Sequence, residues 1–333
     1  MDGNVSLGFL RNSTYLIKKQ YLHKLAHLDE ELFTEYYSLW ITLLVFSTLV
    51  SVVGLVANSI AGWVFCFLIK KKTAPVIYTM NLILTDLLLS LSIPARIIMY
   101  ISKGKCVWCS FAHVFIYFIN MYASIFFLTC ISIDRYLAII HPISSKKWRR
   151  PAYAIAASVF TWFFTSLVVC TVLTMAIKFA SCCYFKLFML SVFEFFLPLI
   201  IITTVTFRMR YALLHNSRST GSDDKARHAA NLLLTVFVIF VVCFTPFHLR
   251  QVVLYGHEGV SERTALIAYH VTLTFSTLNC CLDPIVYCFI NKNFQQALMK
   301  IIRRDQTTAA TDTAITELRD GLSTSETEKE TAK

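Results

Sequence analysis

The sequence predicts an all-α membrane protein: a seven-transmembrane helix bundle followed by a short amphipathic helix on the inner leaflet. Of its 333 residues, 56% are hydrophobic and only 15% are charged, whereas a soluble domain carries about 25% charged residues. The apolar residues form seven runs, each long enough to supply the ~20 residues that a membrane-spanning helix needs. The basic residues gather in the short loops between these runs.

The seven runs are expected to be helices because a helix satisfies its own backbone hydrogen bonds in lipid. None of them alternates polar and apolar residues, as a membrane β-strand would. Their expected bounds are 40–69, 75–101, 109–140, 151–177, 185–207, 229–255 and 265–290. The chain therefore divides into an N-terminal segment (1–39), a membrane domain (40–290), an amphipathic helix (291–304) and a disordered tail (305–333).

Lysine and arginine are concentrated in the loops on one side of these spans. Because cytoplasmic loops carry the excess of basic residues, that side faces the cytoplasm and the N-terminus is expected outside the plasma membrane. Two N-x-S/T sequences, at Asn4 and Asn12, would then be glycosylated. Membrane orientation also accounts for the net charge of +11, so a nucleic-acid partner is not expected.

Two segments outside the spans have amphipathic patterns. Before span one, an apolar helical face is formed by Tyr21, Leu25, Leu28 and Leu32. After span seven, an apolar face opposite basic residues is formed by Phe294, Leu298, Ile301 and Ile302. The second pattern is typical of a helix that lies on the inner leaflet.

Several polar residues are expected at membrane depth, where an ionisable group marks a functional site. The carboxylates of Asp86 and Asp283 lie at a depth comparable to Ser124, Asn58 and Asn279. These oxygen atoms predict a pocket for Na⁺, bound at Asp86 and Ser124 with Asn279 and Asp283, because two unpaired carboxylates would repel each other. The alternative is a hydrogen-bonded cluster in which one aspartate is protonated. No other metal or cofactor is expected.

Three prolines interrupt three successive spans: Pro198, Pro246 and Pro284. Proline removes a backbone donor and kinks a helix, so these positions are predicted hinges. The third span ends in Asp134, Arg135 and Tyr136, where a membrane helix meets water.

The chain resembles the rhodopsin-like (class A) G protein-coupled receptors over about residues 40–303, in the nucleotide and lysophospholipid branch, near an orphan receptor. The resemblance is carried by residues in order along the spans: Asn58 in GLVAN, Asp86 in NLILTD, Asp134-Arg135-Tyr136, Trp162, Pro198 in FFLP, Cys243 to Pro246 (CFTP), Asp283 to Tyr287 (DPIVY) and Phe294.

This resemblance implies a signalling mechanism. Asp134 would hold Arg135 at rest, and an outward swing of span six would free Arg135 to engage a heterotrimeric G protein, the inhibitory type first. Phe244 above Phe240 would be the rotamer switch. The coupling residues implied are Asp134, Arg135, Tyr136, Phe240, Phe244, Pro246, Asp283, Pro284 and Tyr287. Arrestin and a receptor kinase would be partners of the Ser/Thr-rich tail.

The sequence departs from the family pattern at three places. Thr206 stands where relatives have a tyrosine that supports the active state, and Arg250 follows His248 by two residues rather than three. The span-three cysteine, Cys109, is shifted by one residue, so the implied loop disulfide has ambiguous partners. Cys109 is expected to pair, in preference to Cys106, with either Cys182 or Cys183.

The outer half of the bundle is expected to hold a ligand cavity. Tyr117 stands where amine receptors carry an aspartate, so an amine ligand is not expected. The other cavity residues are Arg96, His113, Glu194, His248, Arg250 and His270. Glu194 is the only acid among them, and the cations suit an anionic lipid or nucleotide, although Arg96 and Glu194 are equally explained by pairing with neighbours.

The N-terminal helix has two interpretations. Its apolar face is explained by simple packing, or it covers the outer mouth as a tethered ligand that raises basal signalling. Tethering gives an effective concentration of order millimolar, so weak contacts suffice.

A transporter or channel is the rival class of function, disfavoured by the odd number of spans and the lack of an inverted repeat. An enzyme is not expected, because no nucleophile with a base appears at membrane depth.

Overall fold

The structure is a computed structural model that describes residues 30–103, 105–178, 189, 192–215, 222–256, 261–290, 294–296 and 298–299. Within these residues the regular structure is entirely helical. The elements are α2 (Glu30–Glu35), α3 (Tyr37–Trp63), η1 (Val64–Leu68), α4 (Ala74–Leu91), α5 (Ile93–Ile101), α6 (Val107–Ile140), η2 (Ser144–Lys146), α7 (Pro151–Lys178), η3 (Val192–Phe196), α9 (Leu197–His215), α10 (Ser222–Gly256), α11 (Glu262–Ser276) and α12 (Asn279–Ile290).

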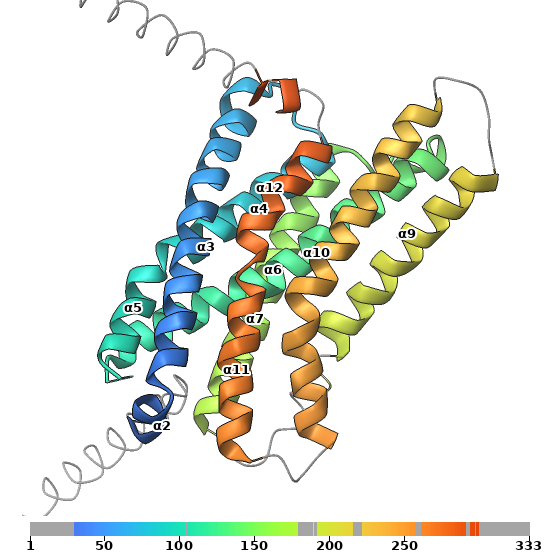
Figure 1. The fold of residues 1–333 in the computed structure, drawn as a ribbon. Coiled ribbons are helices and arrows are strands. Elements are labelled where there is room, and N and C mark those ends of the chain that lie inside the picture. Colours follow the sequence, from blue (N-terminus) through green and yellow to red (C-terminus); the bar gives the residue numbers. More distant parts are fainter. Residues whose placement is uncertain are drawn as a thin grey trace, which may run out of the picture.

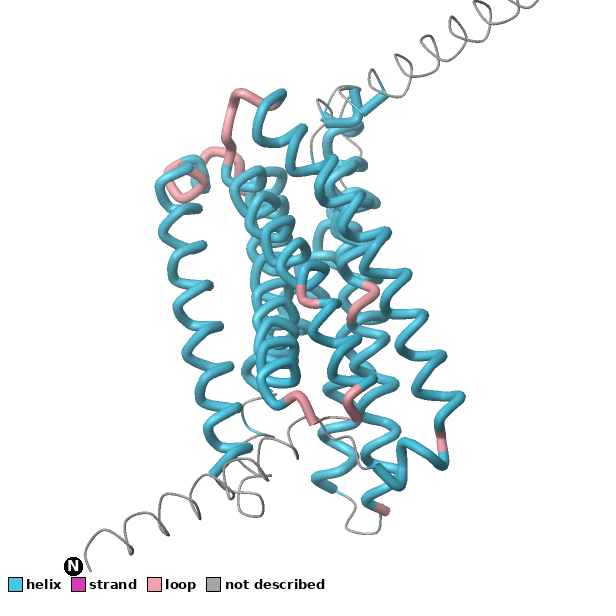
Figure 2. The backbone as a smooth tube through the Cα atoms, turned by 90° about the vertical axis from the view of Figure 1, so that its left-hand side faces the viewer, coloured by secondary structure: helices cyan, strands magenta, loops and turns pink. Residues whose placement is uncertain are grey.

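Seven helical segments of the described chain are long and apolar enough to cross a membrane, which confirms the predicted fold class. They are Tyr37–Leu68, Ala74–Ile101, Trp108–Ile140, Pro151–Thr171, Phe193–His215, Ala226–Leu254 and Arg263–Cys288. The segments run side by side as one bundle (Figures 1 and 2). In Figure 1, α2 and the start of α11 lie at the lower end, and the ends of α3 and α12 lie at the upper end.

The central helix of the bundle is α6, which packs against α4, α5, α7, α9 and α10. Its Ile125, Phe127 and Leu128 side chains are fully buried. By contrast, α3 exposes apolar residues such as Leu49 and Val53 on its outer face, which the other described helices leave uncovered. A helix bundle in lipid requires both an apolar outer surface and a packed apolar interior.

Span two breaks at a position that we did not predict. The helix α4 ends at Leu91 and α5 begins at Ile93, with Pro94 in its first turn. Since Pro94 has no N–H to donate, the α-helical ladder cannot continue unchanged through this point. The Ser92 hydroxyl instead donates to the Leu89 carbonyl oxygen at 2.7 Å. The signal in the sequence was the proline itself, in SIPAR.

Span seven also breaks, between α11 and α12, rather than at the predicted hinge Pro284. At the break, the N–H groups of Thr277 and Leu278 bond three residues back instead of four. The Ser276 and Thr277 hydroxyls donate to the Leu273 and Thr274 carbonyl oxygens, at 2.8 and 2.7 Å. Hydroxyls that bond neighbouring carbonyls compete with the regular helix, which explains why the break lies here.

The other two predicted hinge prolines lie in unbroken helix. Pro198 is in the first turn of α9, directly after the π-helical turn η3. Pro246 is inside α10, which continues on both sides of it. Proline is tolerated in membrane helices where neighbouring groups satisfy the freed carbonyl. A role for Pro198, Pro246 and Pro284 as moving hinges stays a prediction.

Helices α3 and α12 approach closely at Gly54. A Cβ atom on Gly54 would lie 2.8 Å from the Cys280 sulfur, which is closer than real side chains allow, so only glycine fits. One turn further along α3, the Asn58 amide donates to the Cys280 carbonyl oxygen at 2.7 Å. These two contacts hold span one against span seven.

The inner end of span one contacts the start of the predicted amphipathic helix 291–304. Residues 294–296 and 298–299 are helical, and Phe294 is buried against Phe65 with ring centroids 4.9 Å apart. Leu298 is half-buried, and Met299 is exposed. The remaining segments for which we made predictions, including Asn4, Asn12 and the tail 305–333, lie outside the described residues.

Candidate functional site: an inner charged switch joined to a buried polar core

The inner end of α6 carries a charged cluster. The Arg135 Nε atom lies 3.6 Å from the Asp134 carboxylate, as an ion pair without a hydrogen bond. A second arginine, Arg149 from the loop between α6 and α7, donates its Nε–H to the other Asp134 oxygen at 3.1 Å. One carboxylate therefore holds two guanidinium groups. We did not predict Arg149, because only the folded loop brings it to Asp134.

Tyr136, the third residue of the predicted triplet, is half-buried on the far side of this turn. It packs against a small apolar cluster formed by α9 and α10, with Met209, Ala229, Ala230 and Leu233 buried in it. In α9, the Thr206 hydroxyl donates to the Leu233 carbonyl oxygen of α10 at 3.4 Å. At the position where relatives have a tyrosine, this chain thus links the fifth and sixth spans directly.

A hydrogen-bonded polar core lies deeper in the bundle and joins four spans. Asp86 accepts a hydrogen bond from the Asn120 amide at 2.9 Å and one from the Tyr287 hydroxyl at 3.2 Å. The Tyr287 hydroxyl also lies 3.2 Å from the Asn58 side-chain oxygen. All four side chains are buried. Asn120 was missed at the sequence level because it lies among apolar residues of span three.

The other residues predicted for the sodium pocket are also buried. Asp283 lies close enough to Asp86 for their charges to interact. Within the described chain, no hydrogen bond satisfies the Ser124 hydroxyl, the Asn279 amide or the Asp283 carboxylate. Buried polar atoms without partners are costly, and carboxylate, hydroxyl and amide oxygens are the ligands that hard cations prefer. The donor set therefore fits Na⁺.

Aromatic rings of α10 and η3 stack above the polar core. The predicted switch residues Phe240 and Phe244 are fully buried, with ring centroids 5.4 Å apart. Phe195 stacks on Phe240 at 5.4 Å and on His248 at 4.4 Å. Phe195 was missed because an aromatic residue in an apolar run gives no functional signal. Phe244 packs edge-on against Phe240 of this stack, so a change in the Phe244 rotamer would alter that contact.

Most cations predicted for the outer cavity contact neighbouring groups. His113 lies 3.0 Å from the Ser92 hydroxyl. Arg250 donates to the Ala265 carbonyl oxygen at 2.8 Å, and its guanidinium lies over the Tyr269 ring. His270 packs edge-on against the buried Trp40 ring.

Two further outer residues link spans two, three and seven. Arg96 is buried; its Nη2 atom donates to the Thr274 hydroxyl at 3.1 Å, while its Nη1 atom has no hydrogen-bond partner in the described chain. Tyr117 forms a short hydrogen bond with Ser276. The remaining predicted cavity residue, Glu194, is buried beside Tyr122.

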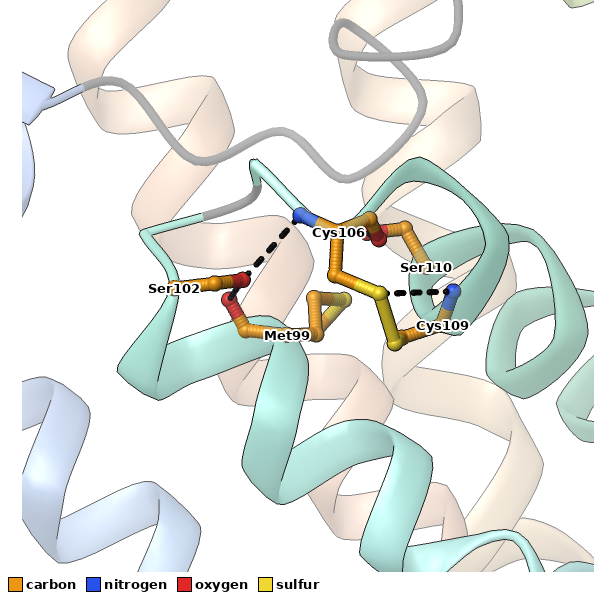
Figure 3. Close-up of a disulfide and its surroundings, with 5 residues drawn as sticks. All are labelled: Met99, Ser102, Cys106, Cys109 and Ser110. Carbon is orange, nitrogen blue, oxygen red and sulfur yellow. Dashed lines mark hydrogen bonds between the residues drawn. A yellow bond between two sulfur atoms is a disulfide. The ribbon is translucent and has the colours of Figure 1, made fainter.

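The structure corrects the predicted disulfide. Cys109 is bonded to Cys106, not to Cys182 or Cys183 (Figure 3), both of which lie outside the described residues. Cys106 is the N-cap of α6, which places Cys109 one turn further with a Cα–Cα distance of 5.3 Å. That distance is in the range that a disulfide spans. The bond therefore closes the first turn of α6.

The bundle of seven spans with α6 at its centre, the predicted charged switch at the inner end of α6 and the buried polar core define a seven-transmembrane receptor. The chain belongs to the rhodopsin family: the sequence model described as 7 transmembrane receptor (rhodopsin family) matches residues 57–287. It is therefore a multi-pass receptor of the plasma membrane whose partner is a G protein, not an enzyme. This membership also decides against a transporter or channel.

Several curated proteins are similar to this chain. G-protein coupled receptor 20 of Homo sapiens is 45% identical over 273 residues, which cover 82% of this chain and 75% of that protein. A purinoceptor of Gallus gallus is 33% identical over 84% of this chain and 85% of its own length. The Uracil nucleotide/cysteinyl leukotriene receptor of Homo sapiens is 33% identical over 75% of this chain and 74% of its own length.

Proposed function

We propose that this receptor signals through an inhibitory-type G protein and that it does so without an added ligand. The observation that carries G protein coupling is Arg135 at the inner mouth, held by an ion pair of 3.6 Å to a carboxylate that it shares with Arg149. The inhibitory type rests on the family likeness alone. A weakly held arginine needs little energy to leave Asp134 and reach a partner.

Arrestin and a receptor kinase are proposed as partners of the tail. Unchanged internalisation after truncation at Arg304 would contradict this part of the proposal.

The basal component of the proposal rests on the N-terminal helix α2, which packs on the outer end of the bundle. Phe33 is buried in one cluster with Trp40 of α3 and with Met99 and Tyr100 of α5. Its neighbour Glu35 forms an ion pair of 3.0 Å with Arg263 of α11. The helix thus contacts spans one, two and seven at once, as a tethered ligand would. This arrangement also requires an extracellular N-terminus.

An anionic lipid or nucleotide ligand is a second candidate, favoured by Arg96. A buried guanidinium nitrogen without a partner in the described chain is costly, and an anion that bonds it would remove this cost. Two relatives carry names that refer to purines, uracil nucleotides and cysteinyl leukotrienes. The two candidates differ in one respect: only the second requires an added molecule.

Nucleotide turnover on purified G proteins tests both candidates. With the full chain and no serum lipids, we expect turnover on the inhibitory type above that of receptor-free membranes, and we expect pertussis toxin to remove it in cells. Turnover that appears only after a nucleotide or lysophospholipid is added would favour the second candidate. A signal that survives pertussis toxin would contradict the proposed subtype.

We further propose that Na⁺ binds at Asp86 and Ser124 and favours the resting state. A ligand present at ten times its dissociation constant stabilises its state by about 1.4 kcal/mol, or roughly tenfold in population. Basal turnover should therefore fall about tenfold between a sodium-free potassium buffer and a sodium buffer of the same ionic strength.

Two variants separate an ion pocket from a structural cluster. Asp86→Asn removes the charge but also alters the bonds to Asn120 and Tyr287. Ser124→Ala removes a hydroxyl that has no partner in the described chain, so it leaves those bonds intact. Both variants should lose most of the sodium response. Sodium dependence that persists in both would leave the cluster with a structural role alone.

A further inference from the structure

A cavity of about 730 Å³ opens at the cytoplasmic end of the bundle, a size typical of sites that bind small molecules. It lies between the loop that joins η1 to α4 and the segment that joins α6 to α7. The residues that line it are Leu68, Ile69, Lys70, Lys71, Lys72, Thr73, Ala74, Pro75, Arg135, Lys146, Arg149 and Pro151. The lining thus combines apolar residues with basic ones.

The charge of this lining is entirely positive. Six of its residues are cations and none is an acid: Lys70, Lys71, Lys72, Arg135, Lys146 and Arg149. The two arginines share Asp134, and Lys72 donates to the carbonyl oxygens of Phe65 and Cys66. The three other lysines are exposed and form no ion pair within the described chain. The exposed cations of the lining that pair with no acid in the described chain are therefore Lys70, Lys71 and Lys146.

The cavity lies at the depth of the inner-leaflet head groups. It is bounded by Leu68, where span one ends, and by Ala74 and Pro151, where spans two and four begin. Next to it, the exposed rings of Trp148 and Tyr153 contact each other with centroids 5.6 Å apart, and such aromatic residues favour the membrane–water interface. A lipid head group reaches this level without leaving the bilayer.

The start of α4 adds to the attraction for an anion. Its N-cap residue, Thr73, makes no side-chain capping bond, and the partial positive charge of a helix N-terminus favours negative groups. The orientation of the protein in the membrane explains why basic residues lie on this side. It does not explain why six of them converge on one cavity with no acid among its lining residues.

We propose that this cavity binds the phosphorylated head group of an inner-leaflet phosphoinositide. A head group with several phosphates can bond several cations at once, and charge-assisted bonds to phosphate are stronger than neutral ones. The apolar residues Leu68 and Ile69 beside the cations suit the attached glycerol and acyl chains. A lipid with one negative charge, such as phosphatidylserine, would use only part of the site.

The test measures binding rather than signalling. The full chain is reconstituted in phosphatidylcholine nanodiscs that contain fluorescent phosphatidylinositol 4,5-bisphosphate, and energy transfer from the receptor reports the bound lipid. Unlabelled phosphatidylinositol 4,5-bisphosphate should displace the probe. Phosphatidylserine at matched total charge, and soluble inositol trisphosphate at matched concentration, should displace it at least tenfold less well.

Two triple variants with the same change in charge locate the site. Lys70→Gln, Lys71→Gln and Lys146→Gln together remove the unpaired cations of the cavity. Arg208→Gln, Arg210→Gln and Arg227→Gln together remove three exposed cations of α9 and α10 on the same side of the membrane. A basic residue near an anionic surface contributes roughly fivefold in affinity, so the first variant should bind about a hundredfold more weakly and the second nearly normally.

Three results would overturn the proposal. Equal losses in the two triple variants would mean diffuse attraction to the membrane surface. Equal displacement by phosphatidylserine at matched charge would mean that the cavity does not recognise phosphoinositides. Equal displacement by inositol trisphosphate would make the ligand a free phosphate compound rather than a lipid. Thermal unfolding of each variant, matched to that of the original chain, excludes a folding defect.

Discussion

Replacement of Arg135 by alanine is expected to abolish G protein turnover while the receptor still folds and reaches the cell surface. Arg135 is half-buried at the inner end of α6, and its Nε atom makes no hydrogen bond within the described chain. Its removal therefore leaves few native contacts unsatisfied, and Arg149 still holds Asp134 at 3.1 Å. Arginine anchors at interfaces contribute about 2 kcal/mol or more, so turnover should fall about 30-fold or more.

The matched control is Arg150→Ala. Arg150 is exposed in the loop before α7 and carries the same charge on the same side of the membrane, but it is not among the arginines that pair with Asp134 in the described chain. Turnover at equal surface expression should be near normal in this variant. Near-normal turnover in both the Arg135 and Arg150 variants would mean that G protein engagement does not depend on Arg135.

Loss of the N-terminal segment, or of the buried α2 side chain Phe33, is expected to lower basal turnover substantially. Deletion of residues 1–30 takes away the chain before α2 and Glu30, the first residue of α2, but keeps Phe33 and Glu35. Phe33→Ala separately removes the α2 side chain that is buried in the outer cluster with Trp40. Truncation of a buried phenylalanine costs about 3 kcal/mol or more in total. If about 1 kcal/mol of this distinguishes the active from the resting state, basal turnover falls roughly fivefold.

Three further variants separate a tethered ligand from simple packing. Leu49→Ala truncates an exposed residue of α3 and should leave basal turnover unchanged. Glu35→Arg reverses one charge of the pair with Arg263 and should lower basal turnover, and the added change Arg263→Glu should restore it. An epitope before α2, stained on intact cells, confirms surface expression and the extracellular N-terminus. Unchanged turnover after both the deletion and Phe33→Ala would remove the tether.

The sequence was sufficient to predict the seven spans because lipid requires each span to be a long apolar helix. It did not reveal where span seven breaks, because Ser276 and Thr277 form the break through local hydroxyl bonds rather than through proline. The break in span two could be inferred from Pro94 in the sequence, although we did not predict it. In both spans the apolar pattern continues through the break with the same period, so the pattern alone does not show the break.

The positions of the charged switch and the polar core could be inferred from residues that stand out in apolar runs, such as Asp86 and Arg135. Their partners could not. Arg149 reaches Asp134 only through the fold of the loop between α6 and α7, and Asn120 reaches Asp86 only through the packing of α4 on α6. The disulfide prediction failed because a cysteine three residues away competes with any distant partner.

The shared carboxylate at the inner mouth has a kinetic consequence. One negative charge on Asp134 faces two positive charges on Arg135 and Arg149, so the resting switch keeps a net positive charge where a cytoplasmic protein arrives. Such a field accelerates the diffusional encounter with an acidic surface, and dissolved salt weakens it over about 10 Å. This field acts before the sixth span moves, and it therefore sets the rate at which a partner first docks. Ionic strength changes this association rate more than it changes the lifetime of the complex.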